Sequence, residues 1–161
     1  MAASVRGPSQ AAIKRHVRLV QELHAALDSL HAWNEFLLAS ASEASATAPR
    51  QSEEMAALRH LVGQTQIALC QRLIELGADG LPAAHKTAPR KTRPPSSVPS
   101  RGSLSVSLNV YLKACRVCGR ALSTAFCAAQ AVADAASARI LYQPIRELEK
   151  QLWLLDPHRT S

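Results

Sequence analysis

The fold is decided by the stretch Ile140-Leu-Tyr-Gln-Pro-Ile-Arg-Glu-Leu-Glu-Lys-Gln-Leu-Trp-Leu-Leu155. Its apolar residues recur at alternating steps of four and three, at Leu141, Ile145, Leu148, Leu152 and Leu155, while charged residues take positions between them. This spacing predicts an amphipathic helix with one buried stripe. Because a single helix in water cannot bury such a stripe, the rest of the chain must supply partner helices.

Two segments in the first half of the chain show the same periodicity. The first covers residues 9–40, with Ser9 as its predicted N-cap, and its inner face is Ile13, Val17, Val20, Leu23, Leu27, Leu30 and Leu37. The second is expected to start near Ser52, after a loop stopped by Pro49, and to end at Gly77. Its buried stripe is Met55, Leu58, Val62, Leu69, Leu73 and Leu76.

A third segment, residues 104–133, precedes the closing helix. Its inner side is Leu108, Leu112, Cys115, Leu122, Phe126 and Ala129. Asp134 is expected to cap the closing helix, and Pro144 to bend or restart it. Four amphipathic helices without a strand pattern predict an all-α antiparallel four-helix bundle, with one long crossover between the second and third helices.

The length and hydropathy of the chain limit its class. With 161 residues it is long enough for one domain with a full core, so we expect a single domain over 1–161 with a flexible tail at 1–8. The sequence shows neither a secretory signal nor an apolar run of roughly 20 residues. These features favour a cytoplasmic protein without a membrane partner.

Positive charge gathers between the second and third helices. The chain has 19 Lys and Arg against 12 Asp and Glu. Residues 78–103 are rich in proline and set one acid, Asp79, against Lys86, Arg90, Lys91, Arg93 and Arg101. These residues, joined by Arg6, Lys14, Arg15 and Arg18, predict salt-sensitive, non-specific DNA binding. The alternatives are a solvated loop without a partner and a charge that only keeps the protein soluble.

Three stretches resemble the Dps mini-ferritin family. Ala133-Asp-Ala-Ala-Ser-Ala-Arg-Ile-Leu141, followed by Arg146-Glu-Leu-Glu-Lys-Gln-Leu-Trp-Leu-Leu155, is similar to the last helix of that family. Gln71-Arg-Leu-Ile-Glu-Leu-Gly-Ala-Asp-Gly-Leu81 resembles the end of its second helix, and Leu30-His-Ala-Trp-Asn34 resembles a motif of its first. The resemblance implies a ferritin-like bundle, a twelve-subunit shell, iron oxidation and storage, and DNA protection under stress.

The family's iron site has the weakest match. In the family it is shared between two subunits and uses a first-helix His with an Asp and a Glu four residues apart on the second helix. The matching second-helix positions here are Ile67 and Gln71, and neither side chain replaces a carboxylate. We therefore expect a degraded ferroxidase centre and doubtful ferroxidase activity. Residual iron binding is assigned to His31, Glu53, Glu54 and His60.

Cysteine and histidine offer two further patterns. Cys115 and Cys118 have the spacing of half a zinc site, but a structural zinc ion needs four ligands, so small buried apolar residues are the preferred interpretation. His16, His24 and His31 are spaced too widely along one helix to hold one ion, which favours solvated or interface histidines. No hydrolase triad or phosphate-binding glycine loop is present.

Two hypotheses for the function remain. The first is a Dps-like homo-oligomer, for which the resemblance implies a dodecamer, that sequesters iron and protects DNA. The second is a non-enzymatic helical-bundle adaptor that binds an anionic or protein partner through its basic loop.

Overall fold

The computed structural model describes residues 9–44, 49–78 and 104–155, and the side chains within them except those of 39–44, 49–52 and 104–108. Four helices account for nearly all of these residues: α1 (Gln10–Ala44), α2 (Pro49–Glu75), α3 (Leu104–Ala131) and α4 (Ala135–Leu155). The described part of the chain has no β-strand. The prediction of an all-α four-helix bundle is therefore confirmed.

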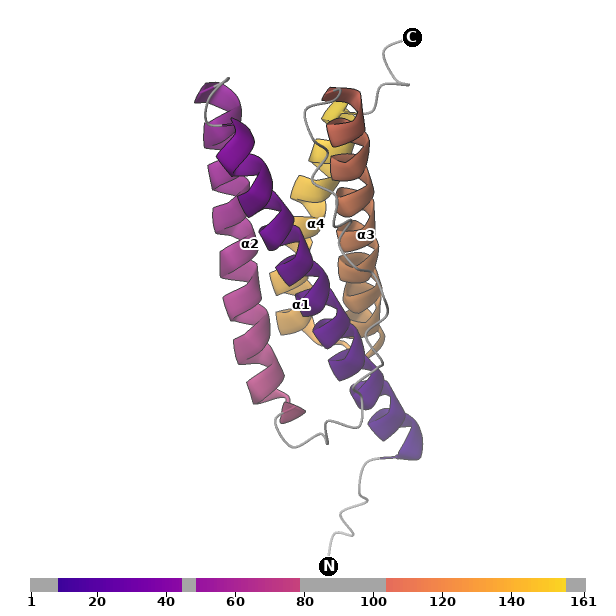
Figure 1. The fold of residues 1–161 in the computed structure, drawn as a ribbon. Coiled ribbons are helices and arrows are strands. Elements are labelled where there is room, and N and C mark those ends of the chain that lie inside the picture. The colour runs from indigo at the N-terminus through magenta and orange to yellow at the C-terminus, as the bar shows by residue number, and fades with distance from the viewer. Residues whose placement is uncertain (1–8, 45–48, 79–103, 156–161) are drawn as a thin grey trace, which may run out of the picture.

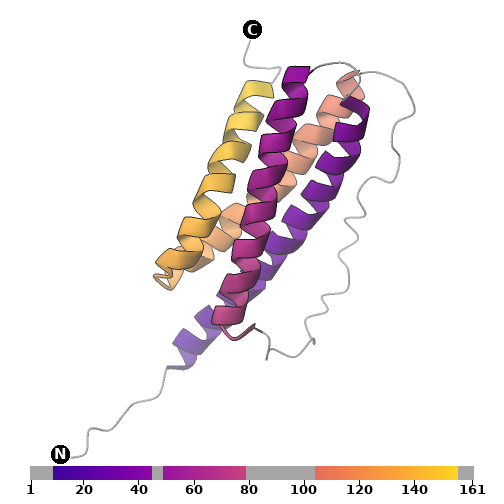
Figure 2. The ribbon, with the colours of Figure 1, turned by 90° about the vertical axis from the view of Figure 1, so that its left-hand side faces the viewer.

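The helices form a ring in which each packs against two neighbours. Helix α1 contacts α2 and α3, and α4 contacts α3 and α2 (Figure 1). Neighbours in the ring run antiparallel, so α2 and α3 run in the same direction (Figures 1 and 2). The end of α2 and the start of α3 consequently lie at opposite ends of the bundle. Residues 1–8 and 79–103, which contain the predicted tail and nearly all of the predicted crossover, lie outside the described residues.

The N-termini of the first two helices differ in how well they were predicted. Ser9 caps α1 as expected, because its hydroxyl oxygen accepts the backbone N–H of Ala12 at 3.2 Å. The predicted start of the second helix near Ser52 is wrong, since α2 begins at Pro49. Proline suits the first position of a helix, where its missing N–H has no intrahelical partner to lose.

The predicted apolar stripes meet in one core. Its fully buried large side chains include Leu19, Leu23, Leu30, Leu37, Leu69, Leu122, Leu141 and Leu148. Trp33, which lies outside the predicted stripe, is buried in the core with 2% exposure. Ile13 is 47% exposed because it lies in the first turn of α1, at the open end of the bundle. Among the described residues no helix is both long and apolar enough to cross a membrane.

The closing helix packs as its spacing predicts. Leu141 and Leu148 are buried, and Pro144 is buried between them. Helix α4 is unbroken from Ala135 to Leu155, so Pro144 does not restart it. The buried stripe of α4 therefore continues on both sides of the proline.

Helices α3 and α4 are joined by a tight turn. The backbone N–H of Asp134 donates to the carbonyl of Ala129 at 2.9 Å, and that of Ala133 donates to the carbonyl of Gln130 at 3.0 Å. These bonds form a Schellman motif, which needs one residue in the left-handed region. That residue is Ala133, with φ of 56°. An alanine there carries a steric cost that glycine does not.

We predict that Ala133→Gly stabilises the bundle by about 0.5–1 kcal/mol, because it removes this steric cost. The matched control is Ala136→Gly on the exposed side of α4, which should destabilise by a similar amount. Urea unfolding followed by circular dichroism measures both. Equal destabilisation by the two variants would contradict the strain at Ala133.

Candidate functional site

The best-connected polar cluster ties the end of α2 to the start of α4. The guanidinium of Arg72 donates to Glu75 at 2.6 Å, to Asp134 at 2.9 Å and to the hydroxyl of Ser137 at 3.3 Å. The side chain of Asp134 is 8% exposed and that of Arg72 is 21% exposed. A partly desolvated, hydrogen-bonded ion pair of this kind is costly to break because one buried charge would remain.

Asp134 also caps α4, as the sequence predicts. Its carboxylate accepts the backbone N–H of Ser137 at 3.1 Å and the Ser137 hydroxyl. Burial alone would raise the pKa of Asp134, but the hydrogen bonds from Ser137 and the charge of Arg72 outweigh it and lower the pKa. Asp134 is therefore held ionised, in a structural role.

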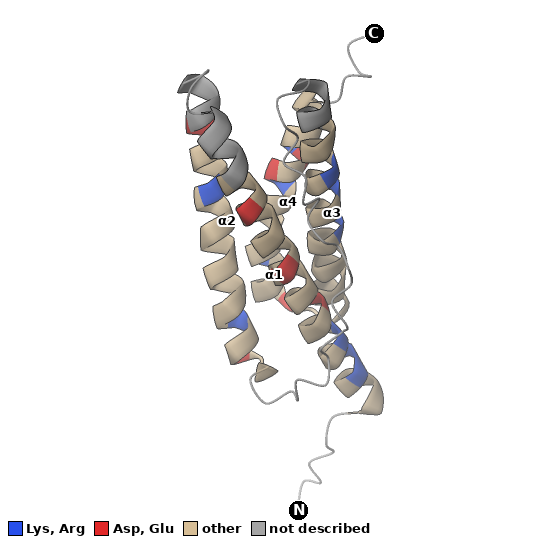
Figure 3. Ribbon diagram, viewed as in Figure 1, with Lys and Arg blue, Asp and Glu red and all other residues tan. Residues whose placement is uncertain are grey.

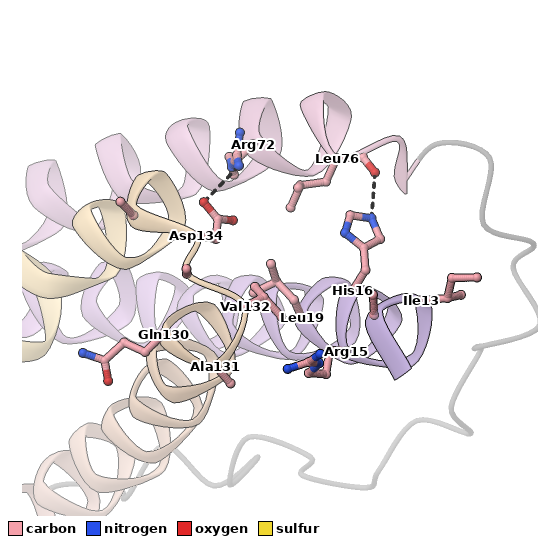
Figure 4. A pocket seen from close by; sticks show the side chains of 13 residues that line it. Ile13, Arg15, His16, Leu19, Arg72, Leu76, Gln130, Ala131, Val132 and Asp134 are labelled. Atoms are coloured by element: carbon pink, nitrogen blue, oxygen red, sulfur yellow. Dashed lines mark hydrogen bonds and ion pairs between the residues drawn. The ribbon is translucent and has the colours of Figure 1, made fainter. Parts of the chain in front are cut away.

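An open pocket of about 910 Å³ adjoins this cluster (Figure 4). The start of α1 contributes Arg15, His16 and Leu19, and the α3–α4 turn closes the opposite side. Its charged side chains and its histidine have partners within the protein. Nε2 of His16 lies 3.3 Å from the carbonyl of Leu76, and Arg15 donates to the carbonyl of Ala11. The pocket contains no activated nucleophile, and we interpret it as a structural junction.

The four predicted metal residues do not meet. His31 projects from α1 toward α2, where its Nδ1 lies 3.1 Å from the amide nitrogen of Gln66. Glu53 is exposed on the first turns of α2. Glu54 and His60 line a second groove, of about 400 Å³, on the opposite side of α2 against α4. Within the described residues, no group of three or more His, Cys, Asp or Glu side chains is arranged to hold a metal ion.

The chemistry of His31 adds to this separation. Because an amide nitrogen only donates, the Gln66 contact makes Nδ1 of His31 the acceptor in this arrangement. Nδ1 of His31 is thus occupied by Gln66 and does not face a metal ligand. His16 and His24 likewise have separate backbone contacts, at Leu76 and Val20. The three histidines on α1 therefore act separately.

The groove between α2 and α4 includes a residue that the sequence did not identify. Glu147 lies beside His60 and Glu54 in its lining, and its carboxylate accepts from Lys150 at 3.3 Å and from Gln151 at 3.1 Å. No spacing in the sequence connects Glu147 with α2, because the two helices are distant in the chain. Both bonds tie Glu147 to its own helix.

The predicted basic residues are only partly described. Lys14, Arg15 and Arg18 are exposed on the first turns of α1, and Arg18 lies 3.9 Å from Glu22. The remaining members of the predicted anion site lie outside the described residues: Arg6, Lys86, Arg90, Lys91, Arg93 and Arg101.

The outward face of α2 carries an apolar stripe. Ile67 and Ile74 are 62% and 59% exposed, and Cys70 between them is exposed. Gly63, one turn before Ile67, has open space where a side chain would be. Ile67 and Gln71 are the positions that correspond to the carboxylates of the resembled family, and both are exposed on this helix.

The two buried thiols, Cys115 and Cys118, are free cysteines in the core of the bundle. Cys115 and Cys118 are 0% and 1% exposed, which confirms them as small core residues. Burial raises the pKa of Cys115 to about 11 and that of Cys118 to about 12. Neither thiol is a thiolate near neutral pH.

Comparisons with known proteins returned no matching family model, no similar curated protein and no similar solved structure.

We predict that Asp134→Asn lowers the free energy of unfolding at pH 7 by roughly 1–3 kcal/mol, because Arg72 loses its ion pair with the buried carboxylate of Asp134 and keeps only the more exposed pair with Glu75. A carboxyl whose pKa is lowered by folding stabilises above its unfolded pKa, and this stability is lost as the pH falls below its ordinary value of 3.8. The deficit of the variant should therefore shrink in acid. Urea titrations at pH 7 and near pH 3 test this, and a deficit independent of pH would refute it.

We predict that two of the four thiols react quickly with a thiol reagent in the native protein at low protein concentration. Cys70 and Cys127 are exposed, whereas Cys115 and Cys118 are buried and carry raised pKa values. Denaturant should release the other two. Fast reaction of Cys115 in the folded protein, detected by peptide mass, would contradict the packing of α3.

Proposed function

We propose that this chain is a Dps-like, ferritin-fold subunit without a ferroxidase centre. It pairs with a second copy through the α1/α2 face, and it associates with DNA through its basic segment, residues 86–101. The α1/α2 face means the outward surface of these two helices. The observation that carries the proposal is the exposed stripe of Ile67, Cys70 and Ile74 on α2, with the half-buried Gly63 one turn before it.

The helix arrangement supports the ferritin-like part of the proposal. All neighbours in the ring run antiparallel, while α2 and α3 run in the same direction (Figure 1). In a four-helix bundle this arrangement requires one long crossover, which distinguishes ferritin-like folds from bundles with short turns. Residues 79–103 stand at the corresponding place in the chain.

The glycine one turn before the stripe favours a close partner. A glycine inside a helix costs about 1 kcal/mol relative to alanine. The packing within one copy does not explain Gly63, since a Cβ there would have no neighbour within 4 Å. Close approach of a second helix would use the missing side chain. Ile67 and Ile74 would then be buried in the same contact.

The charges on the α1/α2 face suit a second copy of the same chain. Lys14 and Arg18 are exposed near the start of α1, whereas Asp28 and Glu35 are exposed farther along it (Figure 3). Glu53 is exposed on the first turns of α2, which follows the end of α1. A two-fold axis across this face would set the basic end of each copy against the acidic end of the other. Such an isologous contact is the commonest form of homodimer.

The same face explains why we assign no ferroxidase chemistry. In the resembled family the shared iron site lies between two subunits. The positions that would supply its carboxylates are Ile67 and Gln71, and isoleucine has no ligand atom. We propose that this surface serves assembly, with iron at most a bound cargo.

We predict that the protein forms dimers or larger assemblies and that Ile67→Asp makes it monomeric while preserving helicity. The matched control is Val117→Asp on α3, since Val117 is also exposed, at 47%. Size-exclusion chromatography with light scattering gives the masses. A monomeric wild-type protein at all concentrations would refute the pairing.

Gly63→Ala should stabilise the isolated bundle by up to about 1 kcal/mol and weaken the assembly.

Cys70 supplies an independent measurement of the same contact. Its alkylation rate should fall as protein concentration rises, because pairing covers it. Cys127, exposed on α3, is the internal control and should react at a constant rate. A concentration-independent rate at Cys70 would place the contact elsewhere.

The iron and DNA parts have separate assays. Aerobic oxidation of iron(II), followed by absorbance, should show no rate above buffer. Mobility shift of plasmid DNA should weaken with salt and after deletion of residues 86–101. Binding that survives the deletion would remove the role of the basic segment, and rapid iron oxidation would show that ligands outside the described residues complete a centre.

A further inference from the structure

Two large aromatic side chains are exposed on α4. Tyr142 is 57% exposed and Trp153 is 61% exposed. Their separation of eleven residues is close to three full turns, so they lie on one stripe of the helix, about 16 Å apart along its axis. Arg146 and Glu149 occupy the turns between them and are also exposed.

This stripe is turned toward α3. The α2 side of α4 is taken by Gln143, Glu147 and Leu154, which line the groove against α2. Tyr142 and Trp153 immediately precede Gln143 and Leu154 in the sequence, and one residue turns a helix by about 100°. They therefore lie away from α2, on the surface that α4 shares with α3.

Helix α3 adds positive charge to this surface. Lys113, Arg116 and Arg120 are exposed at helical spacing, and α3 has no acidic residue (Figure 3). Arg139 and Arg146 add two cations from α4, against one exposed carboxylate, Glu149. Within the part of the chain that the structure describes, none of these five cations forms an ion pair, unlike Arg72 and Lys150.

We propose that this α3/α4 face binds single-stranded nucleic acid, with Tyr142 and Trp153 stacking on bases and the five cations neutralising phosphates. Exposed aromatics among cations are the chemistry of single-strand sites, because unpaired bases present their faces. A duplex keeps its bases stacked inside and would leave the aromatics without a role. The spacing of the two rings corresponds to about five stacked nucleotides at 3.4 Å each.

The inference goes beyond the proposed function, because the α3/α4 face lies across the ring from the α1/α2 face. It needs neither the pairing nor the basic segment. Both copies of a dimer joined through α1 and α2 would present it to solvent.

The test uses the full chain and a 20-nucleotide oligo(dT). Trp33 is buried, so quenching of tryptophan fluorescence during titration reports Trp153. We expect Trp153→Ala and Tyr142→Ala each to weaken binding roughly tenfold, measured by oligonucleotide anisotropy. Leu154→Ala is the matched control. Leu154 is 57% exposed on the same helix but lies toward α2, and its loss should leave affinity unchanged.

The cations have their own readout. Replacing both Arg116 and Arg120 by alanine should reduce the slope of log affinity against log salt by about 1.4, since each phosphate contact on a single strand contributes roughly 0.7. Helicity and thermal unfolding of each variant establish that it is folded.

Several results would overturn the inference. One is wild-type affinity in both aromatic variants. Another is loss of all oligo(dT) binding on deletion of residues 86–101 alone, which would assign the strand to the basic segment and leave the proposed function intact. Binding to a 20-base-pair duplex, or to anionic lipid vesicles, with the same dependence on Trp153 would assign the face to a different partner.

Discussion

The structure depends on burial of aliphatic stripes that no helix can cover alone. Each helix presents one line of leucine, valine or small residues, and Leu23, Leu69, Leu122 and Leu141 are all 0% exposed. Burying a leucine side chain contributes about 1.5–3 kcal/mol, whereas isolated helices of this kind are marginal in water. The four helices therefore fold as one unit. The surfaces left outside are then free to differ in charge and apolar content.

Polar groups are placed where the aliphatic packing ends. Arg72 and Asp134 join α2 to the start of α4 across 62 residues of sequence. The groove between the same two helices is lined by Glu147 and His60. The apolar contact between α2 and α4 is thus supplemented by hydrogen bonds. A pair such as this fixes which helix ends meet, which leucine spacing alone leaves open.

Much of the fold was predictable from periodicity, because apolar residues seven positions apart, such as Leu141 and Leu148, lie on the same side of a helix. Ser9 and Asp134 were correctly predicted as caps, since both are residues whose side chains accept backbone N–H groups. The start of the second helix was wrongly predicted near Ser52. Helix α2 begins at Pro49, because proline is compatible with the first position of a helix as well as with a loop.

The surface sites were less predictable. The Arg72 contact with Asp134 depends on tertiary packing, and nothing in the sequence near Arg72 indicates it. Tyr142 and Trp153 lie off the predicted buried stripe, but the sequence does not show which neighbouring helix they face, and the groove beside Leu154 does. Conversely, the sequence alone placed Ile67 and Gln71 at the positions where the resembled family has its metal-binding carboxylates. The structure shows both residues exposed on α2.

The two buried thiols have a consequence for motion. Cys115 and Cys118 sit in the middle of α3 with almost no solvent contact and with raised pKa values. A reagent can reach them only when α3 separates transiently from the bundle. Their modification rate in native buffer is then the intrinsic thiol rate multiplied by the fraction of time that α3 is open. The protein thus carries a built-in reporter of local unfolding, at a position where an added label would disturb the packing.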